Sequence, residues 1–157
     1  MYEPDFINTL LQIIKDNDLD ISDIYLEITE SAYTSDSLQM IEVVNQLREI
    51  GFSIEMDDFG TGYSSLNMIS DLPIDVLKLD MVFVRNAYKK KDTKIVELII
   101  DIAKYLSVPI IAEGVETKEQ ADSLKKLGCD IIQGYYFSKP IPANEFEKFI
   151  LDRKEMM

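Results

Sequence analysis

Polar side chains recur at the ends of short apolar runs along this chain of 157 residues. They are Glu27, Asp57, Asp58, Lys78, Glu113, Glu116 and Gln133. One polar residue where a strand meets a loop needs no functional explanation, but the same placement on five consecutive runs does. Glu27 and Lys78 also alternate with apolar neighbours, so we expect both to face the interior of a barrel.

The chemistry open to these groups is narrow, because the sequence has no histidine and a single cysteine, Cys129. Ser-His-Asp and Cys-His catalysis and His-ligated zinc are excluded. Converging carboxylates repel one another unless divalent cations are bound. Oxygen-only ligation favours Mg²⁺ or Mn²⁺ over zinc, and two such ions would serve phosphodiester hydrolysis.

Lys78 and the loop after Asp58 each have two interpretations. Lys78 could hold the attacking water or offset developing negative charge, and a buried salt bridge to a carboxylate is compatible with that role. Gly60 and Gly62, on either side of Thr61, could let backbone amides approach a phosphate, or could simply make a tight turn. The adjacent aspartate pair favours a functional loop that orders when ligand and metal bind.

The elements that must position these residues alternate from residue 24 onward, which predicts βα units and a parallel sheet. The predicted strands are Ile24–Thr29, Ser53–Asp57, Val76–Leu79, Pro109–Ala112 and Asp130–Gln133. Active sites of βα barrels lie at the carboxyl ends of the strands, so the polar residues should meet at one edge.

Helices are predicted between and beside the strands. They are Ser37–Ile50 before Gly51, Thr93–Leu106, a helix from a Thr117–Gln120 capping box to Leu127 before Gly128, and two that begin at Pro4 and Pro142. The predicted inward residues are Leu38, Ile41, Val44 and Leu47; Ile95, Leu98, Ile99, Ile102 and Leu106; Ile7, Leu10, Leu11 and Ile14; and Phe146, Phe149 and Ile150.

The net charge of -13 argues against nucleic-acid binding, which depends on basic side chains that neutralise phosphates. The same charge would repel a phosphate ester, so any such activity should depend strictly on metal. The N-terminus does not resemble a signal peptide, and no apolar run is long enough to cross a bilayer. We expect one domain in a reducing cytoplasm, with Cys129 as a small buried hydrophobe.

Five sequence blocks resemble the EAL family of cyclic-di-GMP phosphodiesterases, in family order and with family-like spacing. They are LEITES (Leu26–Ser31), DDFGTGYSSL (Asp57–Leu66), LPIDVLKLD (Leu72–Asp80), AEGVET (Ala112–Thr117) and GCDIIQGYYFSKPIP (Gly128–Pro142). The resemblance implies an α/β fold over residues 1–157, an incomplete (β/α)8 TIM-type barrel with about five parallel strands. It also implies hydrolysis of cyclic-di-GMP to linear pGpG with Mg²⁺ or Mn²⁺, two ions when the site is complete.

The resemblance also implies roles for individual residues. The implied metal-site residues are Glu27, Asp57, Asp58, Glu116 and Gln133. Glu113 matches the glutamate proposed as general base, Lys78 the active-site lysine, and Glu30 the glutamate that anchors the loop with Gly60, Thr61 and Gly62. In the family this loop also contributes to dimerisation.

Three departures from the family pattern bear on activity. The Glu-Ala-Leu segment, whose glutamate is a metal ligand, and an asparagine ligand on the following strand have no counterpart here. Glu55 stands where the family usually has a small residue, and it shares the strand phase of Asp57. Such barrels run to roughly 250 residues, so we expect the first strands to be missing and the barrel to be open. A homodimer, or association with a missing segment or regulatory domain, would cover the open edges.

Three functions therefore remain open. The chain could be a phosphodiesterase domain, active within a longer protein or with a partner. It could be a catalytically inactive module that binds cyclic-di-GMP or a protein, or a truncated product without a function of its own. Glu113, Lys78 and the paired aspartates favour the first function, and the missing Glu-Ala-Leu segment favours the second.

Overall fold

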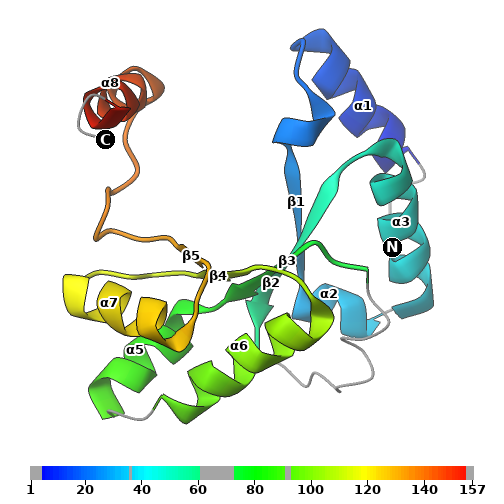
Figure 1. Cartoon of the computed structure of the whole chain (residues 1–157). Helices are drawn as coiled ribbons and strands as arrows, with labels where there is room; N and C mark the ends of the chain where they lie inside the picture. Colours follow the sequence, from blue (N-terminus) through cyan, green and yellow to red (C-terminus); the bar gives the residue numbers. More distant parts are fainter. Residues whose placement is uncertain (1–4, 36, 61–72, 91–92, 155–157) are drawn as a thin grey trace.

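The computed structural model describes residues 5–35, 37–60, 73–90 and 93–154, so Thr61 and Gly62 lie outside the described residues. Within these described ranges, five parallel strands form one sheet in the sequential order β1-β2-β3-β4-β5 (Figure 1). The strands are β1 (Tyr25–Thr29), β2 (Ser53–Phe59), β3 (Val76–Leu79), β4 (Ile110–Ala112) and β5 (Ile131–Ile132). All five predicted strands are present, and the incomplete parallel barrel is confirmed.

The helices connect and cover the strands. They are α1 (Phe6–Asp16), the short 3₁₀ helix η1 (Ile21–Asp23), α2 (Glu30–Ser35), α3 (Ser37–Ile50), α5 (Met81–Lys90), α6 (Lys94–Leu106), α7 (Lys118–Leu127) and α8 (Ala143–Lys154). Figure 1 shows α5, α6 and α7 gathered on one side of the sheet. The capping box of Thr117 and Gln120 is present at the start of α7, as predicted. Neither α2 nor α5 was predicted.

The core lies between the sheet and the helices. Burial of the helix residues tests which face of each helix was correctly predicted to point inward. The α1 face is confirmed, because Ile14 is buried and the three other predicted residues pack against the core. The predicted inward face of α3 is wrong at Leu38, which is 78% exposed. The predicted inward face of α6 is wrong at Ile95 and Leu98, which are also exposed. Both helices carry apolar residues on more than one side, so periodicity alone could not select the face that meets the sheet.

Helix α8 stands apart from the other helices, at the end of an extended stretch after β5 (Figure 1). Phe146 and Ile150 were predicted to point inward, but they are 50% and 37% exposed. The prediction is wrong because an apolar helix face is buried only where another element covers it, and none of residues 143–152 is buried. Within the described ranges, no helix has both the length and the apolar character needed to cross a membrane.

Candidate active site

A bulge in β2 sets two carboxylates at the end of that strand. The β2–β3 pairing shifts register between Met56 and Phe59, so Asp57 and Asp58 together lie opposite Lys78. Asp58 has a φ of 57°, a left-handed conformation that aspartate tolerates better than most residues. Its backbone N–H donates to Oδ1 of Asp57 at 2.9 Å. Bulges of this kind re-aim side chains and are common beside active sites.

Lys78 is the centre of a cluster of ion pairs. Its Nζ atom lies 2.6 Å from Oε1 of Glu27, 2.7 Å from Oε1 of Glu113 and 3.3 Å from Oδ1 of Asp57. These residues come from β1, β2 and the residue after β4, so four neighbouring strands supply the Lys78 cluster. The side chain of Lys78 is only 6% exposed, whereas that of Glu27 is 51% exposed. The predicted buried salt bridge is present, with three partners.

The carboxylates keep Lys78 charged. Burial alone lowers the pKa of this amine, but hydrogen bonds to Glu113 and Glu27 and the charges of Glu113 and Asp57 outweigh burial, so the net pKa is raised. A lysine in this state remains an ammonium ion at neutral pH. Lys78 can therefore neutralise negative charge, but it cannot accept a proton as a base.

Glu55 adds a further carboxylate to the Lys78 cluster. It lies opposite Glu27 in the β1–β2 register and is 8% exposed. Burial raises the pKa of Glu55; the Lys78 charge opposes this rise, and the charges of Glu27, Glu113 and Asp57 add to it. The expectation that Glu55 shares the strand face of Asp57 agrees with these interactions.

Asp58 lies close to the carboxylates of Asp57 and Asp80. Loss of hydration, then the charges of Asp57 and Asp80 and a hydrogen bond with Asp80, raise the pKa of Asp58. Carboxylates that share a site in this way repel one another, and a proton or a cation bound between them reduces that repulsion.

Glu116 is held by two helices. Oε1 of Glu116 forms a salt bridge with Arg85 of α5 and accepts a hydrogen bond from its Nη2 atom at 2.6 Å. The backbone N–H of Glu116 donates to Oε1 of Gln120 in α7 at 2.7 Å. Arg85 was missed from the sequence because α5 was not predicted. The available signal was Asp80, whose Oδ1 accepts the Val82 N–H at 2.7 Å and so caps the start of α5.

A cavity of about 290 Å³ adjoins the Lys78 cluster. Its lining includes Glu113, Glu116, Gln133, Arg85 and Tyr135. Glu113 therefore belongs to both the cavity and the Lys78 cluster. Gln133 lines the cavity, so the structure brings it together with Glu113 and Glu116.

Gly134 fixes the backbone next to Gln133. Its φ is 157°, and a Cβ atom at this position would lie 2.2 Å from the carbonyl oxygen of Val115. The Val115 N–H donates to the Gln133 carbonyl at 3.2 Å, and the Tyr136 N–H donates to the Val115 carbonyl at 2.9 Å. Only glycine fits this close approach of two chain segments.

Glu30 contacts the first residue of the loop after β2. The Gly60 N–H donates to Oε2 of Glu30 at 3.1 Å, and Glu30 is 2% exposed. Gly60 has a φ of 91°, a conformation that glycine adopts without strain. This contact is the one that a loop anchor needs, and the anchoring role itself stays a prediction.

The donor set fits a hard divalent cation in its chemistry, because it consists of carboxylate and amide oxygens. It does not form a complete site: the described residues contain no group of three or more His, Cys, Asp or Glu side chains arranged to hold a metal ion. Lys78 engages three of the carboxylates instead.

Three comparisons with known proteins bear on this arrangement. The model of the family described as "EAL domain" matches residues 1–140. The cyclic di-GMP phosphodiesterase NbdA of Pseudomonas aeruginosa is 42% identical over 126 residues, which cover 80% of this chain and 16% of NbdA. The chain thus spans about a sixth of the length of that relative.

Two solved structures have the same fold over most of the chain. The EAL domain of Mycobacterium smegmatis DcpA superposes with a TM-score of 0.87 and 34% identity, and covers 97% of this chain and 69% of that one. Klebsiella pneumoniae BlrP1, in a complex with manganese and cyclic-di-GMP, superposes with a TM-score of 0.79 and 31% identity. It covers 88% of this chain and 35% of that one.

Proposed function

The chain belongs to the EAL domain family, and we propose that its polar cluster is the active site of a metal-dependent phosphodiesterase that opens cyclic-di-GMP to linear pGpG. The observation that carries this proposal is the convergence of Glu27, Asp57 and Glu113 on Lys78. Phosphodiester hydrolysis needs an activated water and compensation of negative charge, and these groups suit both tasks. The proposal treats residues 1–157 as one domain.

The proposed cofactors are two Mg²⁺ or Mn²⁺ ions. The residues that would hold them are Glu27, Asp57, Asp58, Glu116 and Gln133. When bound, such ions polarise a phosphate and lower the pKa of a water. The oxygen-donor chemistry of these residues and the manganese complex of BlrP1 support this assignment.

Glu113 is the proposed general base. It takes a proton from the attacking water while the water oxygen forms a bond to phosphorus. The bond from phosphorus to the ribose oxygen breaks, and that oxygen takes a proton from solvent. The 2.7 Å contact with Lys78 holds Glu113 in place, and the Lys78 charge offsets the negative charge of the phosphate.

The loop after β2 completes the proposed site. Glu30 anchors the loop through the Gly60 N–H, and Gly60, Thr61 and Gly62 approach the substrate in this proposal. For Thr61 and Gly62, which lie outside the described residues, the support is the resemblance of their sequence block to the EAL family.

The proposal extends to assembly and location. Strands β1 and β5 end the described sheet, and unpaired edges favour association with another chain. We therefore include a homodimer, or a segment or regulatory domain that completes the barrel. A cytoplasmic location is supported by a single cysteine, which excludes an intrachain disulfide.

A second function, binding of cyclic-di-GMP without turnover, is favoured by one observation. Within the described residues, the acidic side chains form no complete metal-ligand group. Catalysis that needs two ions falls steeply when one position is weakened, whereas binding of a nucleotide depends on it less.

The deciding experiment measures pGpG formation by the purified chain with Mn²⁺ or Mg²⁺, together with calorimetric titration of cyclic-di-GMP. We expect turnover that ends when EDTA is added. Glu113→Gln should reduce the rate by about 10²–10⁴-fold, and Glu145→Gln on α8 should leave it unchanged. Binding without turnover would establish the second function instead. Turnover that survives Glu113→Gln would contradict the assignment of the base.

A further inference from the structure

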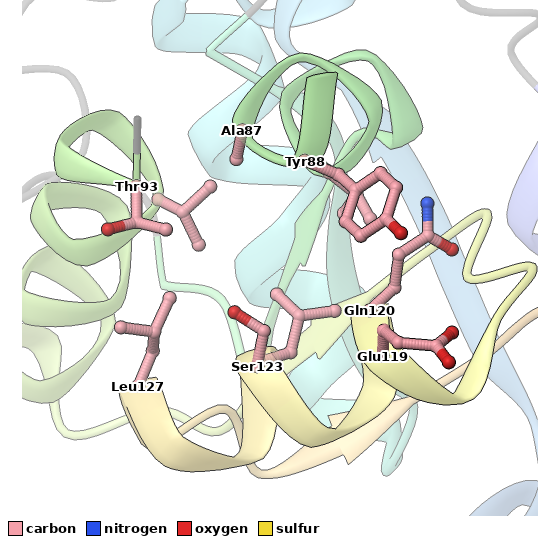
Figure 2. A pocket seen from close by; sticks show the side chains of 10 residues that line it. Ala87, Tyr88, Thr93, Glu119, Gln120, Ser123 and Leu127 are labelled. Carbon is pink, nitrogen blue, oxygen red and sulfur yellow. The ribbon is translucent and has the colours of Figure 1, made fainter. Parts of the chain in front are cut away.

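A second cavity, of about 450 Å³, lies between α5, α6 and α7 (Figure 2). Its apolar lining includes Val84, Val96 and Leu124, all of which are nearly fully buried. Its volume is within the range of sites that bind small molecules, which are typically apolar with a few polar groups. Neither the Lys78 cluster nor the proposed hydrolysis uses this cavity.

Polar groups gather on this apolar lining. Figure 2 shows the side chains of Tyr88, Glu119 and Ser123 around the cavity. The hydroxyls of Tyr88 and Ser123 have no hydrogen-bond partner within the described part of the chain. Hydrogen bonds to its own backbone N–H and to the Thr117 hydroxyl lower the pKa of Glu119, so its carboxylate is negative at neutral pH.

Two of the helices that line the cavity, α5 and α7, also hold Glu116. Gln120 lines the cavity, and its Oε1 atom accepts hydrogen bonds from the N–H groups of Glu116 and Thr117. Helix α5 lines the cavity with Val84 and contacts Glu116 through the adjacent residue, Arg85. A molecule bound between α5 and α7 would therefore affect both contacts of Glu116, the one with Arg85 and the one with Gln120.

We propose that this cavity is a regulatory site for a small alkylamine that carries an aromatic ring, and that its occupancy is transmitted to Glu116 through α5 and α7. An aromatic ring suits the apolar lining, and the two free hydroxyls can accept or donate hydrogen bonds. The ammonium group suits the Glu119 carboxylate. The net charge of -13 disfavours an anionic ligand.

The test is titration of the ¹⁵N-labelled chain with tryptamine, followed by amide chemical shifts. Indole and indole-3-acetate carry the same ring with neutral and negative charge. For a ligand of this size we expect a Kd for tryptamine on the order of 1 mM, with weaker binding of indole and the weakest binding of indole-3-acetate. The amide signal of Glu116 should move in parallel with signals from the cavity.

Two substitutions separate the cavity from the surface. Ser123→Leu fills the cavity and should raise the tryptamine Kd by about tenfold, whereas Asp122→Leu, on the exposed side of the same helix, should not. Glu119→Gln should raise the tryptamine Kd by about threefold and leave the indole Kd unchanged. Ala87→Leu, on α5, is a second filling variant if Ser123→Leu does not fold, as judged by circular dichroism.

Three results would overturn the proposal. One is the absence of saturation by tryptamine at about 10 mM. Another is binding that Ser123→Leu or Ala87→Leu leaves intact. The third is binding without movement of the Glu116 amide signal, which would remove the regulatory link. None of these readouts depends on hydrolysis, so failure here is distinct from failure of the proposed function.

Discussion

The Nζ atom of Lys78 lies 2.7 Å from Oε1 of Glu113, and the same ammonium group contacts Glu27 and Asp57. A single buried cation thus balances three partly exposed carboxylates. Because that cation belongs to the chain, it competes with any divalent ion for the same oxygens.

Replacement of Lys78 tests this competition. Lys78→Met should lower the free energy of unfolding by about 1 kcal/mol, because the carboxylates lose their counter-charge but remain partly hydrated. Added Mn²⁺ should then raise the Tm of the variant more than that of the natural chain. Thermal unfolding with and without Mn²⁺ measures both effects. Lys104→Met, at an exposed ion pair, is the control, and equal Mn²⁺ shifts in all three proteins would contradict the prediction.

Arg85 should matter for metal binding more than for stability. Arg85 and Glu116 are 43% and 46% exposed, so Arg85→Ala should change the free energy of unfolding by only about 0.5 kcal/mol. The Arg85 contact is at Oε1 of Glu116 and holds this carboxylate in one orientation, so without it Glu116 should bind Mn²⁺ more weakly, by about threefold. Arg85→Lys should restore part of the loss.

The matched control for Arg85 is Arg48, which pairs with Asp75 at 2.8 Å. Asp75 also accepts the Ile54 N–H at the start of β2, at the opposite end of the strand from Asp57. Arg48→Ala should lower stability without affecting Mn²⁺ titration. A loss of Mn²⁺ affinity in Arg48→Ala as large as that in Arg85→Ala would mean that general loosening, not Glu116, is responsible.

Gly134→Ala should be strongly destabilising, by about 3 kcal/mol, because the added Cβ meets the backbone of Val115 at 2.2 Å. Gly51→Ala is the comparison. Gly51 has a φ of 116°, but a Cβ there would lie 3.6 Å from Ile21, so only the cost of about 1 kcal/mol for conformation applies. Urea unfolding of both variants measures the difference, and similar losses would show that the contact with Val115 relaxes easily.

Cys129 should be unreactive in the folded chain. Burial raises the pKa of its thiol, hydrogen bonds from neighbouring backbone groups partly oppose this, and the Sγ atom donates to the Ile131 carbonyl at 3.1 Å. The thiolate is the reactive form, so labelling by iodoacetamide at neutral pH should be slow until urea unfolds the chain. Rapid labelling of the native chain would contradict burial of this thiol.

The raised pKa of the Cys129 thiol predicts how stability depends on pH. The protonated thiol is favoured in the fold, so its contribution to stability is present below the pKa of the unfolded thiol and is lost as pH rises through the raised folded value. The free energy of unfolding should fall above about pH 9, and Cys129→Ala should make that fall less steep. Equal pH slopes for both proteins would contradict the prediction.

Much of the site was predictable because parallel strands end at a common edge. The placement of Glu27 and Lys78 on one face follows from strand alternation, and the structure joins them directly. The bulge at Asp57 and Asp58 was not predictable, since it depends on the register with β3 and on a left-handed residue that is not glycine. The role of Arg85 in holding Glu116 depends on helix α5, which was not predicted although Asp80 caps its start.

The helix faces were less predictable for a different reason. In α6, Ile95 and Leu98 compete with Val96, Ile99 and Ile100 for the core, and the sheet decides between two apolar stripes. Helix α8 does carry the apolar residues that predicted an inward face, but no surface of the described chain buries them.

The sequential order of the sheet has a consequence for how the chain acquires its structure. Each strand pairs with the one before it in the chain, so every new pairing closes a loop no longer than one βα unit. Short loop closures are entropically cheap, and they allow each unit to dock as soon as it leaves the ribosome. The Lys78 cluster, which draws on β1 through β4, can therefore form during synthesis, before α8 exists.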